Sequence, residues 1–107
     1  MKHLLVTSLM LLLGISAALA QNDISQQRMA ELKNLLIQDC GSCHGLLLKG
    51  GLGPELSAAR LGQLPAEYIT NTILNGHPGT AMPPWKAILS ESEARWITTL
   101  LQQGDLP

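Results

Sequence analysis

The sequence predicts an all-α fold, with three main helices joined by two loops rich in glycine and proline. Three stretches space their apolar residues at helical intervals, and no stretch alternates apolar and polar residues with the period of a strand. The two loops, "GLLLKGGLG" and "HPGTAMPPW", fit neither period. Because glycine permits close backbone approach, we expect these loops to suit contact with a flat ligand.

The chain begins with the features of a secretory leader. A basic start at Lys2 precedes an apolar run from Leu4 to Ile15 and small residues that end at Ala20. This order predicts a signal peptide over residues 1–20, because the apolar run is shorter than the about 20 residues that a membrane span needs. An uncleaved anchor is the alternative. Residues 21–107 are then expected to form one exported domain without a membrane span.

The expected domain carries slightly more acidic than basic residues. From residue 21 onward, six Lys and Arg residues stand against eight Asp and Glu residues, which gives a net charge near −2. A nucleic-acid-binding domain would show a basic patch, so this balance argues against that class. A domain this small, with no Phe, also needs a staple, a metal or a cofactor to complete its core.

The first predicted helix covers residues 26–39. Met29, Leu32 and Leu36 recur at i, i+3 and i+7 and form an apolar stripe. This helix leads directly into Cys40.

Two further helices have start and stop signals. The second has Pro65 in its first turn and Gly76 as its stop. The third opens with Ser90 and Glu93 in the register of a capping box and ends at Gly104.

Cys40, Cys43 and His44 form the motif C-x-x-C-H. A disulfide across so few residues would stabilise little. A thiol–disulfide oxidoreductase would need strands around the motif. A zinc site needs four ligands, and after residue 20 only His77 remains as a further nitrogen donor. The motif is the signature of covalent haem attachment, in which two thioether bonds hold the porphyrin and the next imidazole reaches the iron. We therefore predict one covalently bound haem c, with His44 as an iron ligand.

A second axial ligand must come from elsewhere in the chain. Met82 lies in a loop stiffened by two prolines, where a purely structural methionine is unusual. His77 is the alternative, and Met29 is better explained by packing on the first helix. Pro54 can offer only its carbonyl, which we predict to accept a hydrogen bond from His44. Its alternative role is to stiffen the loop.

These residues resemble the small class I cytochromes c of bacterial periplasms. More narrowly, "DCGSCHGLLLKGGLGP", "ILNGHPGTAMPPW" and "LSESEARWITTLL" resemble the cytochrome c55X group, which is encoded beside the haem c/haem d1 nitrite reductase of denitrifying bacteria. The resemblance covers about residues 28–103. It implies a fold in which the first and last helices cross beside one haem. It departs from the class at this crossing, where Leu32 and Leu100 replace the usual glycine and aromatic residue, so Trp96 is expected on a neighbouring face.

The resemblance also implies the site residues and the function. Cys40 and Cys43 would bind the haem through thioethers, His44 and Met82 would ligate the iron, and Pro54 would accept from His44. The protein would be a periplasmic, monomeric one-electron carrier of a Gram-negative bacterium rather than an enzyme. Its partner would be dissimilatory nitrite reductase in denitrification. The alternatives are a redox accessory to a d1 haem maturation protein, and a haem protein that binds ligands or reacts with peroxide if Met82 dissociates.

Overall fold

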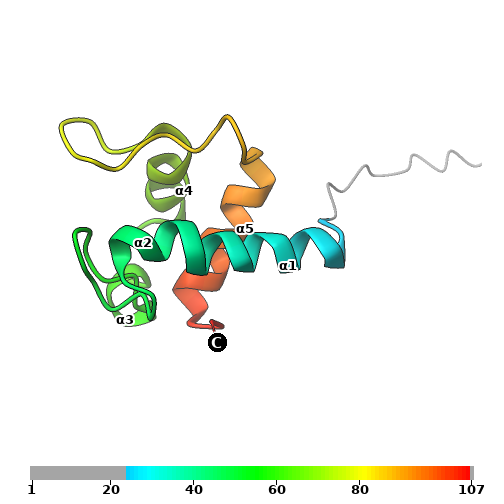
Figure 1. Cartoon of the computed structure of the whole chain (residues 1–107), viewed down its shortest axis with the longest axis horizontal. Coiled ribbons are helices and arrows are strands. Elements are labelled where there is room, and N and C mark those ends of the chain that lie inside the picture. Colours follow the sequence, from blue (N-terminus) through cyan, green and yellow to red (C-terminus); the bar gives the residue numbers. More distant parts are fainter. Residues whose placement is uncertain (1–23, 107) are drawn as a thin grey trace, which may run out of the picture.

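The computed structural model describes residues 24–106, and every regular element in this range is a helix (Figure 1). The predicted signal peptide lies outside the described residues. Three main helical stretches and one short helix make up the fold, which confirms the all-α prediction. Their bounds are α1 Gln26–Leu35, η1 Leu36–Cys40, α2 Gly41–His44, α3 Ala58–Leu61, α4 Ala66–Asn75 and α5 Glu91–Gln103.

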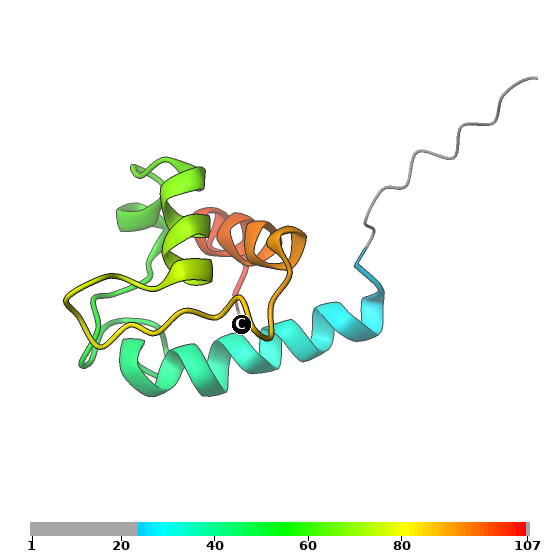
Figure 2. The same cartoon turned by 90° about the horizontal axis from the view of Figure 1, so that it is seen from above.

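The first stretch is one continuous rod made of α1, η1 and α2 (Figure 2). The Ser25 side chain begins it by accepting a hydrogen bond from the Arg28 amide at 3.1 Å. The middle segment η1 is a π-helical turn, and the rod continues through His44 to Gly45, whose φ is +90°. The predicted helix therefore extends five residues beyond Asp39, so that the C-x-x-C-H motif is itself helical.

The second and third predicted helices are confirmed with their signals. α4 begins directly after Pro65 and ends before Gly76, whose φ is +73°. α5 begins with the predicted capping box, in which the Ser90 hydroxyl and the Glu93 carboxylate each bind the other residue's backbone amide. Gly104 ends α5 in the left-handed conformation, which costs a glycine little.

The short helix α3 was not predicted. The Ser57 hydroxyl accepts from the Arg60 amide at its start. At its end, the Gln102 amide of α5 donates to the carbonyls of Leu61 and Leu64 at 3.1 and 2.9 Å. A helix of four residues cannot be stable alone, so this tertiary contact holds it in place.

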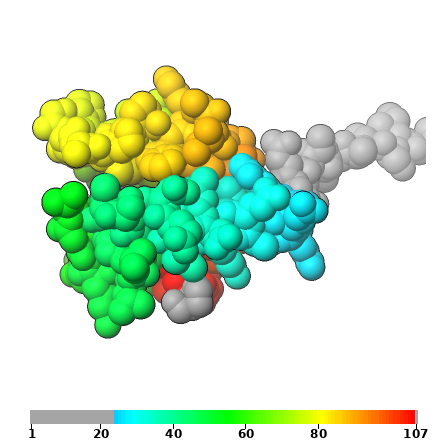
Figure 3. Space-filling model, in the orientation of Figure 1, coloured from blue at the N-terminus to red at the C-terminus, as the bar shows by residue number. Residues whose placement is uncertain are grey.

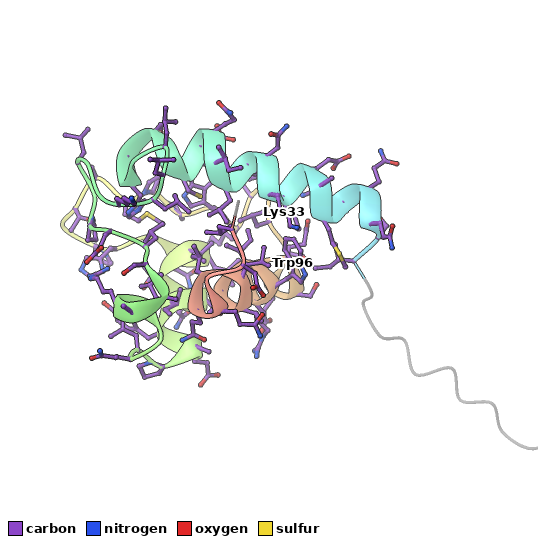
Figure 4. All side chains as sticks on the ribbon, turned by 90° about the horizontal axis from the view of Figure 1, so that it is seen from below. Lys33 and Trp96 are labelled. Atoms are coloured by element: carbon purple, nitrogen blue, oxygen red, sulfur yellow. The ribbon has the colours of Figure 1, made fainter. Side chains whose placement is uncertain are left out.

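The core is aliphatic and lies where the long rod crosses α5 (Figure 1). Figure 4 shows Lys33 of α1 and Trp96 of α5 at this crossing. Leu32 is completely buried and Leu100 is partly exposed, while Trp96 and Trp85 pack against the core from its margin. The buried cluster consists of Leu32, Leu36, Leu48, Leu61, Ile69, Leu89, Ile97 and Leu101.

Two polar contacts fix the helices to one another. The Thr70 and Thr98 hydroxyls, both buried, lie 2.9 Å apart and join α4 to α5. The Arg28 guanidinium, at the start of the rod, donates to the Glu93 carboxylate at the start of α5. None of the helices within residues 24–106 combines the length and apolar character needed to cross a membrane.

Candidate functional site

The motif residues share one face at the end of the rod. Cys40 closes η1, while Cys43 and His44 lie in α2, and the i, i+3 and i+4 spacing places all three side by side. Both cysteines are free thiols, with Cys40 partly buried and Cys43 exposed. Burial raises the pKa of the Cys40 thiol to about 11, and the neighbouring Asp39 carboxylate adds to the rise. Cys40 is therefore a protonated thiol at neutral pH.

The His44 ring is oriented by the loop that follows it. Its Nδ1 lies 2.7 Å from the Pro54 carbonyl oxygen. Because a carbonyl can only accept, Nδ1 carries a proton in this contact, which leaves Nε2 as the ring nitrogen that could bind a metal. This is the arrangement of a metal-binding histidine, whose second nitrogen donates to a backbone carbonyl. The structure thus brings Pro54 and His44 together as predicted, and their roles toward an iron stay a prediction.

Backbone hydrogen bonds fold this loop back onto the end of the rod. The Gly50 amide donates to the His44 carbonyl and the Gly53 amide to the Cys43 carbonyl, both at 2.8 Å. These bonds satisfy carbonyls that a helix end leaves without partners. Gly53 also lies against the imidazole, since a Cβ built on it would be 2.7 Å from the His44 Cε1 atom.

The loop between α4 and α5, which includes Met82, lies at the same end of the described fold as the loop that follows the motif (Figure 1). The side chain of Met82 is partly buried, and its amide donates to the Thr80 hydroxyl at 3.3 Å. In the space-filling view a furrow separates the segment with Met82, drawn in yellow, from the segment with the motif loop, drawn in green (Figure 3).

The two other candidate ligands lie in different places, His77 on the same loop as Met82 and Met29 far along the rod. His77 is exposed at the start of the Met82 loop. Met29 lies on the rod 15 residues before His44, which corresponds to about 20 Å along a helix. This separation excludes Met29 from a site built around His44.

Two open hollows of about 480 and 500 Å³ lie between α4 and α5, and neither includes a motif residue. Glu67, Thr70 and Arg95 line both hollows, and the lining of the second is more apolar than that of the first. Nor does the described part of the chain gather three His, Cys, Asp or Glu side chains into a group that could hold a metal ion, as zinc would require. The free thiols, the oriented imidazole and the furrow therefore fit a covalently attached haem better than a zinc ion.

Three leucines near the motif are largely exposed in the structure. Leu46 is 67% exposed, Leu47 75% and Leu52 95%. Leu48 between them is buried in the core, with a φ of +56° that is rare for a leucine. No periodic pattern in the sequence identifies the leucine that turns inward.

Comparisons with known proteins show which family the chain resembles. Residues 27–101 match the family described as "Cytochrome C oxidase, cbb3-type, subunit III". The chain is 48% identical over 88 residues to a cytochrome c55X of Pseudomonas aeruginosa, covering 82% of this chain and 74% of that protein. A solved structure of the c-type cytochrome NirC superposes with a TM-score of 0.76 at 48% identity, covering 78% of this chain and 99% of the other.

A more distant relative is an enzyme. The chain is 31% identical over 95 residues to a dihydro-heme d1 dehydrogenase of Pseudomonas aeruginosa. The match covers 89% of this chain and only 19% of the enzyme, so a single module of that larger protein is shared.

Proposed function

Since the chain belongs to the cytochrome c55X family of small c-type cytochromes, which are electron carriers and not enzymes, we propose that it carries single electrons in the periplasm for dissimilatory nitrite reduction. A haem c, when bound, supplies an iron that alternates between the ferrous and ferric states. The observation that carries the proposal is the 2.7 Å contact from the His44 Nδ1 to the Pro54 carbonyl, beside two free thiols on the same helix face.

Four residues would bind the haem, and a fifth, Pro54, would orient one of them. Cys40 and Cys43 would fix it through thioether bonds, and the C-x-x-C spacing on one helix face supports this assignment. His44 would ligate through Nε2, because its Nδ1 proton is committed to the Pro54 carbonyl. Met82 would be the second axial ligand. With both axial positions filled by side chains, oxygen or peroxide finds no open site, which suits transfer of electrons alone.

The proposed location and organisation follow from the sequence. We infer that residues 1–20 are a signal peptide, and that residues 21–107 act as a monomeric domain with one haem in the periplasm. The proposed partner is the haem c/haem d1 nitrite reductase.

A second candidate function is supported by the likeness to the d1 dehydrogenase. Because this chain is similar to one module of a dihydro-heme d1 dehydrogenase, a free-standing protein that accepts electrons during maturation of haem d1 is the second candidate. In this function the site residues keep their roles and only the partner differs.

Deletion of the gene in a denitrifying bacterium would separate the two functions. A pure electron donor leaves nitrite reductase fully loaded with haem d1, whereas a maturation accessory leaves it depleted. We expect the reductase to be fully loaded, measured as d1 absorbance per mole of purified reductase. We also expect the deletion strain to reduce nitrite more slowly. Depleted reductase would replace the donor assignment with the accessory one.

The Met82→Ala variant tests the second axial ligand. We expect loss of the weak far-red band of ferric iron–thioether coordination, binding of carbon monoxide, and a potential lower by on the order of 0.1–0.2 V, a part of the about 0.8 V range set by axial ligands. Optical spectra and redox titration measure this. Met29→Ala is the matched control, because Met29 lies about 20 Å along the rod from His44 and its loss should change none of these readouts. An unchanged spectrum in Met82→Ala would transfer the assignment to His77.

A further inference from the structure

The segment that carries Met82 is held against the end of α4. The Trp85 amide donates to the Ile73 carbonyl at 3.0 Å, and the Lys86 amide donates to the Leu74 carbonyl at 3.1 Å. Closer to the turn, the His77 amide donates to the Met82 carbonyl at 3.2 Å. Residues 82–86 therefore run back along residues 73–77.

These bonds meet a need of both segments. The last carbonyls of α4 have no partner inside the helix, and the amides of a proline-rich segment have none of their own. Their pairing ties the backbone on the C-terminal side of Met82 to a rigid element, since α4 packs extensively on α5. The position of Met82 is thus set by α4 rather than by the loop alone.

Gly76 lies at the centre of this contact and is buried. Its φ is +73°, and a Cβ built on it would lie 2.7 Å from the Met82 carbonyl oxygen. The same Cβ would lie 3.0 Å from the Pro83 carbonyl carbon and from the Pro84 nitrogen. All three neighbours are backbone atoms, so rotation of a side chain cannot relieve the overlap. Any larger residue at position 76 must displace the backbone of Met82.

We propose that Gly76 is a positioning residue for Met82. The Cα of Gly76, which carries no side chain, contacts the backbone of residues 82–84 and so fixes where the Met82 thioether lies. The inference rests on the proposed function, in which Met82 ligates the haem iron. It adds that the ligand's position depends on Gly76, six positions earlier, which has no side chain to ligate the iron. The consequence is a coupling between the end of α4 and the iron potential.

Gly79 provides a matched control on the same loop. Its φ of +80° is close to that of Gly76, but a Cβ built on it meets nothing within 4 Å. Alanine has an unfavourable positive φ at both positions, and only at position 76 does it also collide with the Met82 backbone. Gly79→Ala therefore controls for a positive φ on this loop without the contact.

The test compares Gly76→Ala, Gly79→Ala and Met82→Ala as haem proteins exported with a cytochrome c maturation system. For Gly76→Ala we expect loss of most of the far-red iron–thioether band and a lowered potential, with covalent haem staining unchanged. For Gly79→Ala we expect the band and the potential to be retained. Retention of the band in Gly76→Ala, or equal loss in both glycine variants, would overturn the inference.

Two further readouts keep the test decisive. If Met82→Ala loses the band while Gly76→Ala keeps it, the ligation stands and only the positioning role is wrong; if Met82→Ala keeps it, the ligation itself is wrong. Should Gly76→Ala fail to accumulate, amide exchange in the unaltered haem protein decides. The inference is supported if the Trp85 and Lys86 amides exchange as slowly as the amides of α4. It is overturned if they exchange as fast as the Gly79 amide.

Discussion

Gly53 is small because the His44 ring occupies the space where a side chain would be. A Cβ at this position would lie 2.7 Å from the Cε1 atom and 2.8 Å from the Nδ1 atom of the ring. Contact, and not backbone strain, sets this requirement, because the φ of Gly53 lies outside the left-handed region. Gly53 therefore lets the chain pass close enough for the next carbonyl, that of Pro54, to reach Nδ1.

We expect Gly53→Ala to lengthen the hydrogen bond from His44 to Pro54. Overpacking of this kind should cost about 1–3 kcal/mol in the free energy of unfolding. A weaker hydrogen bond at Nδ1 makes the imidazole a poorer electron donor to the iron, which should raise the midpoint potential of the haem protein. Denaturant titration and redox titration measure the two effects.

Gly41→Ala is the control for this change. Gly41 lies inside the motif, but a Cβ there would have no contact shorter than 3.5 Å. Because Gly41 is helical, alanine should leave the potential unchanged and add about 0.5–1 kcal/mol of stability. Equal potentials in both variants would show that the Gly53 contact does not orient His44.

At the scale of elements, helix ends were predictable wherever the signal is local. Pro65, Gly76, Ser90, Glu93 and Gly104 each act within one turn of the helix they bound, and the structure confirms all of them. α3 was missed because the Gln102 side chain, 41 residues beyond Leu61, holds its end. The one local signal was Ser57, a serine directly before two alanines.

The same distinction between local and distant signals separates the predictable part of the candidate site from the rest. The motif and the Pro54 contact could be predicted because the residues lie within 15 positions of one another and their chemistry is specific. The position of the Met82 segment against α4 could not be predicted. It depends on hydrogen bonds from the backbone amides of Trp85 and Lys86, and no sequence pattern identifies their partners. Likewise, the extension of the rod through His44 depends on a π-helical turn that has no sequence signature here.

The buried threonine pair between α4 and α5 predicts an asymmetric response to substitution. Thr98 has a second partner, because its hydroxyl also donates to the Ala94 carbonyl at 2.9 Å, whereas Thr70 bonds only Thr98. Thr98→Val leaves the Thr70 hydroxyl buried without a partner and should cost about 1–3 kcal/mol. Thr70→Val leaves Thr98 satisfied and should cost about 1 kcal/mol or less.

The double variant completes a thermodynamic cycle. With both hydroxyls replaced, neither is left buried without a partner. The double variant should therefore lose less free energy of unfolding than Thr98→Val alone. Chemical denaturation of the four proteins measures the cycle. Equal losses in the two single variants would show that water, and not Thr98, satisfies the Thr70 hydroxyl.

At the scale of the whole molecule, one ion pair joins the first helix to the last. Arg28 donates to the Glu93 carboxylate and, at 3.3 Å, to the Ile88 carbonyl. The Glu93 side chain is only 15% exposed. Burial alone would raise the pKa of Glu93, but the hydrogen bonds from Arg28 and from Ser90 outweigh it and hold the pKa below the ordinary range.

This lowered pKa predicts acid sensitivity. A carboxyl that binds its proton more weakly when folded contributes stability above its unfolded pKa of about 4.3, and the contribution is lost as pH falls through the lower folded value. Glu93→Gln should therefore lower stability at neutral pH and flatten its decline in acid. Unfolding followed between neutral pH and strong acid measures this.

Glu31→Gln is the matched control, since Glu31 also pairs with Arg28, at 3.0 Å, but its side chain is half exposed. Exposed pairs contribute little, so this variant should follow the unaltered protein at every pH. If both variants flatten the decline of stability in acid equally, the acid sensitivity arises from the charge of Arg28 and not from the burial of Glu93.

The order of folding follows from where the Met82 segment lies in the chain. It is the connection between α4 and α5, and these two helices share the most extensive contact in the described fold. Contacts between neighbours in sequence close short loops and form early, whereas Arg28 and Glu93 meet across 65 residues. Amide-exchange labelling during refolding should show α4 and α5 protected before α1. One wall of the proposed site is thus formed early by a local hairpin of helices, while the rod with the two cysteines remains accessible to the machinery that modifies them.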